Sequence, residues 1–95
     1  MERDYAALLH PIIDPLVENP QAVMIRELPG STKRDVTVVI VAEDEDTARL
    51  IGKHGTVANA IREVISIATR ADETNQRIHI RFESFSDGQE EANEE

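Results

Sequence analysis

The chain has 95 residues, of which 19 are acidic and 10 are lysine or arginine, giving a formal net charge of −9 at pH 7. This length suits one domain with a modest core and leaves no room for a deep, enclosed active site. It contains no cysteine, which excludes disulfides and thiolate-bound zinc or iron–sulfur clusters. No apolar run approaches the roughly 20 residues that cross a bilayer, and the acidic N-terminus does not resemble a signal peptide. We therefore expect a cytoplasmic protein that has no cofactor and no contact with a membrane.

The negative charge is concentrated in two segments. Glu43–Asp46 carries four acids, and residues 87–95 carry five acids and no base. Between Thr47 and Ser86, six lysines or arginines stand against four acids. Since phosphate binding depends on Lys and Arg, the overall acidity disfavours nucleic acid as a ligand, whereas this central stretch permits it.

The first predicted element is a helix over residues 4–19, where apolar residues recur at the three-and-four spacing of an amphipathic helix. Pro11 and Pro15 interrupt the pattern and predict a kink or two short helices. Asn19 and Pro20 are a stop signal for this element.

Two strands are predicted next, at Val23–Leu28 and Val36–Ala42, joined by a hairpin loop at Pro29–Arg34. Val36–Ala42 is almost wholly β-branched and apolar on both faces, which is typical of a central strand. The acidic Glu43–Asp46 segment is predicted to cap a short helix over Thr47–Ile51.

Gly52 ends that helix, and a longer one is predicted from Thr56 to Ala71. Its predicted buried stripe consists of Val57, Ala60, Ile61, Val64, Ile65 and Ala68. In the last strand, Arg77–Phe85, strict alternation places Ile78, Ile80 and Phe82 inward. The acidic residues 86–95 are predicted to be a disordered tail.

The order helix, strand, strand, helix, helix, strand predicts an α+β fold. The first two strands should be antiparallel and the last two parallel, giving a mixed three-stranded sheet with the helices on one face. We expect residues 1–85 to form a single domain with its core in residues 22–84.

The loop Gly52-Lys53-His54-Gly55 lies between the two later helices. Glycine tolerates positive φ and lets a sugar-phosphate backbone approach closely. The N–H groups that begin the next helix favour an anion, Lys53 adds a positive charge, and His54 is suited to donate to a phosphate or to stack on a base. The alternative is an ordinary helix–helix turn with a glycine C-cap.

This arrangement of a β-branched strand, a short helix, an Ile51-Gly52-x-x-Gly55 loop, a long helix and a strand resembles the core of a KH domain. The helix and strand in front of it resemble the type II form of that domain. The chain is similar to the small bacterial single-KH proteins of the KhpA type. The resemblance implies that it binds single-stranded RNA without catalysis, as an RNA chaperone or post-transcriptional regulator. It also implies a homodimer, or a heterodimer with another KH-containing protein.

The resemblance further implies an apolar groove beside the loop. Candidates for this groove are Ile51, Ala58, Asn59 and Arg62 on the helices, and Val38 or Ile40 on the neighbouring strand. Together with the loop, the predicted RNA-binding set is Ile51, Gly52, Lys53, His54, Gly55, Thr56, Asn59 and Arg62. The simpler alternatives are ordinary core for Ile51 and the strand residues, and solvated surface for Asn59 and Arg62.

Two features argue for weak binding with little sequence specificity from one module. Only one lysine lies in the loop, and the chain has three aromatic residues for stacking. A rival function is therefore a protein–protein adaptor that has kept the fold but has little RNA affinity. An enzyme has little support, because no nucleophile–base pair and no metal-ligand set can be placed.

Overall fold

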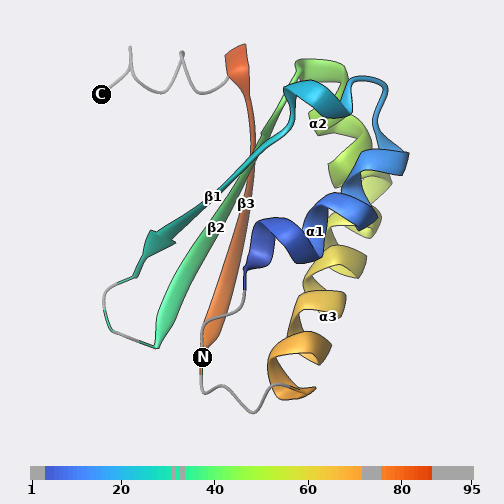
Figure 1. Cartoon of the computed structure of the whole chain (residues 1–95). Coiled ribbons are helices and arrows are strands. Elements are labelled where there is room, and N and C mark those ends of the chain that lie inside the picture. Colours follow the sequence, from blue (N-terminus) through green and yellow to red (C-terminus); the bar gives the residue numbers. More distant parts are fainter. Residues whose placement is uncertain (1–3, 31, 33, 72–75, 87–95) are drawn as a thin grey trace.

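The computed structural model describes residues 4–30, 32, 34–71 and 76–86. Its helices and strands follow the predicted order (Figure 1). They are α1 (Tyr5–Ile13), β1 (Met24–Pro29), β2 (Asp35–Ala42), α2 (Asp44–Ile51), α3 (Thr56–Ala71) and β3 (Arg77–Ser84), with short 3-10 turns at Asp14–Leu16, Pro20–Ala22 and Lys53–Gly55. The predicted acidic tail lies outside the described residues from position 87 onward. No described helix is long and apolar enough to cross a membrane.

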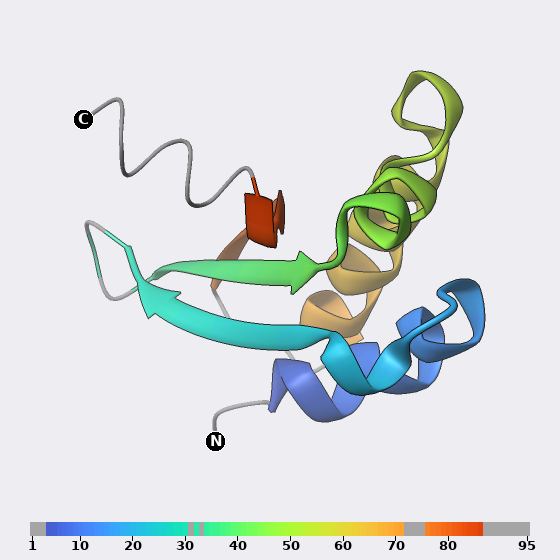
Figure 2. The ribbon, with the colours of Figure 1, turned by 90° about the horizontal axis from the view of Figure 1, so that it is seen from above.

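The sheet has the predicted mixed topology, with β2 in the centre. β1 runs antiparallel to β2 and places Ile25 opposite Ile40, while β3 runs parallel to β2 and places Phe82 opposite the same Ile40. The helices lie on one side of this sheet, as the two perpendicular views show (Figures 1 and 2). These findings confirm the predicted α+β fold class.

The proline-containing N-terminal segment forms two short helical pieces. α1 ends at Ile13, and Pro15 lies in the separate 3-10 turn that follows. The carboxylate of Asp4 caps α1 by accepting from the backbone N–H of Ala7 at 3.1 Å. Tyr5, Leu9 and Ile13, spaced by four residues, are fully buried and anchor α1 against the sheet.

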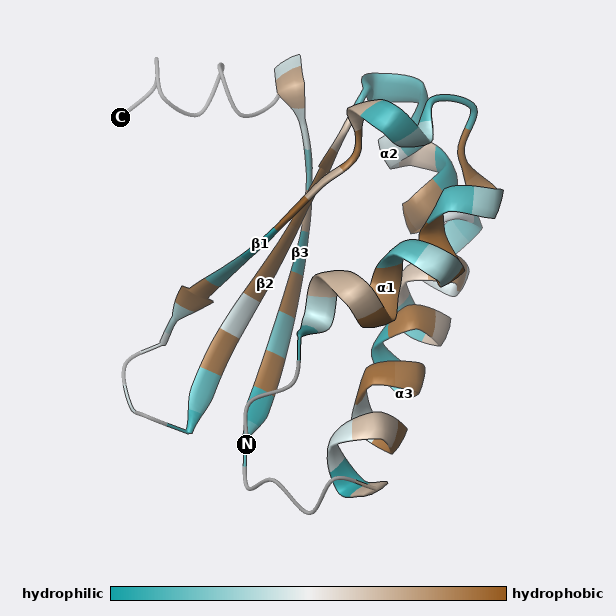
Figure 3. Cartoon of the chain, in the orientation of Figure 1, coloured by the Kyte–Doolittle hydropathy of each residue, from teal (hydrophilic) through white to brown (hydrophobic). Residues whose placement is uncertain are grey.

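The core lies between the helices and the covered face of the sheet. Its buried members come from α1, the sheet, α2 and α3, and include Leu9, Val38, Ile40, Ala42, Leu50, Ile61 and Ile65. Figure 3 shows apolar residues alternating with polar ones along the last strand, which is the pattern of a sheet covered on one face only.

The buried stripe of α3 differs from the prediction. The buried residues are Ala58, Ile61, Ile65 and Thr69, whose spacing of three and four follows the helical period. Ala60 and Val64 were predicted to be buried but are exposed. The prediction failed because nine of the 16 residues of α3 are apolar, so hydrophobicity alone does not identify the inward face. α3 consequently presents an apolar strip to the outside.

The predicted capping role of Glu43–Asp46 is also wrong in part. α2 begins at Asp44, and Glu43 occupies the N-cap position without a side-chain capping bond. Asp46 is 2% exposed and accepts from the backbone N–H groups of Glu18 and Asn19, both at 3.0 Å. It also pairs with Arg49 on its own helix. This carboxylate therefore fastens the segment after α1 to α2.

Candidate nucleic-acid interface

Gly52 makes the sharp turn between α2 and α3. Its backbone has φ 76° and ψ 175°, a conformation that is essentially restricted to glycine. A Cβ atom at this position would lie 2.5 Å from Cγ2 of Val57 and 2.9 Å from the Val57 backbone nitrogen. The turn therefore depends on glycine for both its dihedral angles and its close packing against the start of α3.

The rest of the loop faces outward. His54 is the one described non-glycine residue with positive φ, at 59°. Gly55 also has positive φ, but a Cβ atom there would meet nothing within 4 Å. The space in front of Gly55 is thus open to an approaching ligand, whereas the space in front of Gly52 is filled by protein.

The loop is held by internal bonds that leave its two basic side chains available. The N–H of Gly55 donates to the carbonyl of Gly52 at 3.2 Å, and the hydroxyl of Thr56 donates to the carbonyl of Lys53 at 2.9 Å. Lys53 and His54 are exposed, and within the described part of the chain neither has a hydrogen-bond or ion-pair partner. These two side chains and the N-terminal N–H groups of α3 are suited to hold a phosphate.

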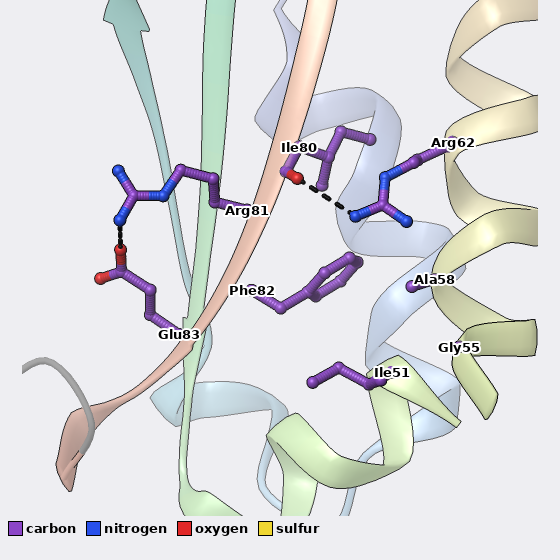
Figure 4. A pocket seen from close by; sticks show the side chains of 8 residues that line it. All are labelled: Ile51, Gly55, Ala58, Arg62, Ile80, Arg81, Phe82 and Glu83. Carbon is purple, nitrogen blue, oxygen red and sulfur yellow. Dashed lines mark hydrogen bonds and ion pairs between the residues drawn. The ribbon is translucent and has the colours of Figure 1, made fainter. Parts of the chain in front are cut away.

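A groove of about 400 Å³ begins at this loop and runs between the helices and β3. It is lined by Ile51, Gly55, Ala58, Arg62, Ile80, Arg81, Phe82 and Glu83. Figure 4 shows Ile51, Ala58 and the ring of Phe82 converging, with Arg62 crossing towards β3. Arg81 and Glu83, 2.6 Å apart, project from the other side of β3. The groove therefore has an apolar floor formed by Ile51, Ala58 and Phe82, with one guanidinium at the end away from the loop.

β3 forms the strand wall of the groove. The two strand candidates, Val38 and Ile40, do not line it and belong to the core, which was the alternative given for them. Both residues are 0% exposed, because β2 is the central strand and its inward side chains are covered by the helices. β3 is an edge strand, so its inward-pointing Ile80 and Phe82 reach the groove. Sequence reasoning assigned these two residues to the inward face without connecting that face to the groove.

Arg62 bridges the two walls of the groove. Its Nη1 donates to Oδ1 of Asn59 at 3.2 Å, and its Nη2 donates to the carbonyl of Ile80 at 3.4 Å. The guanidinium carbon lies 5.9 Å from the centre of the Phe82 ring, within the range of a cation–π interaction. Asn59 is exposed, is not among the residues that line the groove, and is linked to it through Arg62.

The structure thus brings the predicted residues together in two adjoining sets. Gly52, Lys53, His54 and Thr56 form the loop, while Ile51, Gly55 and Arg62 line the groove. Within the described ranges there is no group of three or more His, Asp or Glu side chains that could hold a metal ion.

Comparison with known proteins identifies the family. The sequence model described as KhpA/KhpB, KH domain matches residues 6–80 of the chain. The chain belongs to this family. The match spans the elements from α1 into β3, including the loop and most of the groove-lining residues.

Individual relatives agree with this assignment. The chain is 33% identical over 73 residues to the RNA-binding protein KhpA of Listeria monocytogenes, covering 77% of this chain and 93% of the relative. It is 35% identical over 75 residues to the RNA-binding protein KhpA of Clostridium acetobutylicum, covering 79% and 95%. It is 31% identical over 65 residues to the RNA-binding protein KhpA of Treponema pallidum, covering 68% of this chain and 79% of the relative. No solved structure matches at the same level of significance.

Proposed function

We propose that this chain is a non-catalytic RNA-binding protein that holds single-stranded RNA with the Gly52–Gly55 loop and the adjoining groove. The observation that carries the proposal is the position of an open, basic glycine loop at the mouth of a groove with an apolar floor. Such an arrangement accommodates phosphates at the loop and bases in the groove, the mode by which KH domains clamp about four nucleotides. Its relatives' name, RNA-binding protein KhpA, supports the same function.

The proposed cellular role is that of a cytoplasmic RNA chaperone or post-transcriptional regulator that works as a dimer. One module holds few nucleotides, and its loop supplies few cations, so a single copy binds weakly. Joining two modules raises the overall affinity by making the second contact intramolecular.

The exposed strip on α3 is the surface we propose for pairing with a second copy of this chain. It consists of Ala60, Val64 and Ile67, spaced by four and three residues on one side of the helix, with Val64 37% and Ile67 52% exposed. An apolar helical strip of this kind is suited to pack against its own symmetry mate. Pairing with a different KH-containing protein through the same strip is the alternative outcome.

Reversing the loop charge tests the RNA-binding proposal. The double variant Lys53→Asp/His54→Asp is expected to lose at least about 100-fold in affinity for a short single-stranded RNA, because it places two carboxylates where the phosphate lies. Its fold should be unchanged, since both side chains are exposed and Asp tolerates positive φ. Fluorescence anisotropy at low salt measures the binding, and circular dichroism checks the fold.

The matched control is Ser66→Asp/Arg70→Asp, which gives the same net charge on an exposed face of α3 away from the loop. This control should lose only a few-fold in affinity through general repulsion. Equal losses in both variants would contradict the loop assignment. If the wild-type chain retained no RNA at low salt, the adaptor function would be supported instead.

The double variant Val64→Asp/Ile67→Asp tests the dimer proposal. Charges on this strip should shift the molecular mass measured by light scattering from dimer to monomer without lowering the melting temperature by more than a few degrees. Affinity for an RNA long enough to reach two loops should fall by about tenfold or more, and affinity for a four-nucleotide RNA should not change. A wild-type chain that is monomeric at high concentration would refute self-pairing.

A further inference from the structure

We propose that Arg62, the carbonyl of Ile80 and the ring of Phe82 form a base-reading site that prefers cytosine. The inference rests on the proposed RNA-binding function and adds to it the class of base. It is carried by the bridge that Arg62 makes across the groove in the RNA-free protein.

The bridge places one acceptor beside several donors at the far end of the groove. β3 pairs with β2 along one edge only, and the Ile80 carbonyl receives a bond from Nη2 of Arg62. A guanidinium has five N–H donors in a fixed plane and no acceptor. The bond to Asn59 leaves most of these donors available and restrains the orientation of the plane.

The contact between Arg62 and the Ile80 carbonyl can be replaced when a base binds. The 3.4 Å contact between Nη2 and the Ile80 carbonyl is long for an N–H to O hydrogen bond. A base that supplies its own donor to the carbonyl, and its own acceptors to the guanidinium, replaces this one long bond by shorter ones. A matching base edge can therefore take the place of the direct contact between Arg62 and the Ile80 carbonyl.

Cytosine has the matching edge. Its Watson–Crick side carries an amine donor followed by two acceptors, N3 and O2, which complement one carbonyl followed by two guanidinium donors. Uracil has an N–H donor between two acceptors, and its N3–H would face the guanidinium. Adenine offers the amine and one acceptor only. Guanine has two donors on its Watson–Crick side and would have to turn its O6 and N7 edge towards Arg62.

Phe82 supplies the surface under the base. Its ring is half-buried and faces the groove opposite Ala58 (Figure 4), and stacking on an aromatic ring stabilises every base to a similar degree. Phe82 thus contributes affinity, while Arg62 and Ile80 contribute discrimination. A preference at one base position is compatible with a module that binds weakly overall.

The test compares short single-stranded RNAs at one salt concentration by fluorescence anisotropy. Wild type is expected to bind hexacytidine at least about fivefold more tightly than hexauridine or hexaadenosine, the lower range for one bidentate base contact. A hexamer of the pyrimidin-2-one nucleoside keeps O2 and N3 but lacks the amine. It should bind with intermediate affinity, because it satisfies Arg62 and leaves the Ile80 carbonyl without a donor.

Two variants separate the roles. Arg62→Lys keeps the charge but loses the planar fork, so it should bring the cytosine-to-uracil ratio close to one while changing affinity for hexauridine less than about threefold. Phe82→Leu should weaken all hexamers by a similar factor, about tenfold, and preserve the ratio. The inference is overturned if Arg62→Lys keeps the cytosine-to-uracil affinity ratio of the wild type, whether its overall affinity is unchanged or falls equally for every base.

Failure of this inference is distinguishable from failure of the proposed function. A wild-type chain that binds all hexamers equally well refutes cytosine reading and leaves RNA binding intact. A wild-type chain that binds none of them at low salt refutes RNA binding itself.

Discussion

Alanine at Gly52 is expected to destabilise the fold by about 4 kcal/mol, through strain in a glycine-only backbone conformation together with overpacking. The added Cβ atom would meet Val57 at 2.5 Å, and a loss of this size is a large fraction of the stability of a small domain. Alanine at Gly55 should cost only about 1–2 kcal/mol, because it meets positive φ but no neighbouring atom. Urea unfolding followed by circular dichroism measures both changes.

For the RNA affinity of the folded protein, the order of the two substitutions is expected to reverse, with Gly55→Ala having the larger effect. Gly55→Ala should weaken RNA binding by about tenfold or more, since its methyl group occupies the open space at the mouth of the groove. Binding titrations performed where both variants are folded provide the comparison. Equal destabilisation by the two substitutions, or unaltered RNA affinity in Gly55→Ala, would contradict the assigned division between a structural and a contacting glycine.

Asp46→Asn is expected to lower the melting temperature by roughly 10 °C at pH 7. The carboxylate accepts from the N–H groups of Glu18 and Asn19 and pairs with Arg49. An amide of the same shape can present only one oxygen, and its NH2 group would face donors. The expected result is the loss of the link between the N-terminal segment and α2.

The effect of this substitution should depend on pH in a defined direction. The backbone N–H of Glu18 lowers the pKa of Asp46 most, the N–H of Asn19 and the guanidinium of Arg49 lower it further, and burial opposes them. A lowered pKa in the folded state stabilises the protein above the unfolded pKa of about 3.8, and this contribution is lost as the pH falls towards the folded pKa. The difference between the melting temperatures of wild type and Asp46→Asn should therefore shrink as the pH falls below about 4, and it should vanish only below the folded pKa.

The control for this series is Asp44→Asn, which removes the same charge from an exposed position in the first turn of α2. It should change the melting temperature by only a few degrees at every pH. A difference between wild type and Asp46→Asn that does not shrink as the pH falls below about 4 would show that the carboxylate charge is not what stabilises the fold.

Local sequence signals were sufficient for the elements and the sheet topology. The β-branched run Val36–Ala42 indicates a central strand. The two helices between it and the last strand indicate that the two strands pair in parallel. Gly52 and Gly55 marked the loop for the same reason, because tight turns with positive φ favour glycine whatever surrounds them. The bounds of α3, Thr56–Ala71, agree with the prediction.

Features that depend on distant contacts were not predictable in the same way. Asp46 looked like one more acid at a helix start, and only the folded chain shows that Glu18 and Asn19 lie against it. Likewise, β3 and not β2 forms the groove wall because β3 is at the edge of the sheet. The contact between Arg62 and the Ile80 carbonyl joins residues that are 18 positions apart in the sequence. Periodicity describes a face, but it does not say what that face contacts.

The parallel pairing of β2 with β3 has a consequence for how the protein acquires its activity during synthesis. Asp35 pairs with Arg77, so the two strands are joined across some forty residues, and closing such a loop is slow compared with forming a local hairpin. The ribosome makes β3 after every other described strand and helix. A nascent chain therefore has its glycine loop before it has Ile80 and Phe82, and the groove beside the loop is completed only when the last strand is released and docks. Premature capture of RNA, including the message being translated, is disfavoured by this order of assembly.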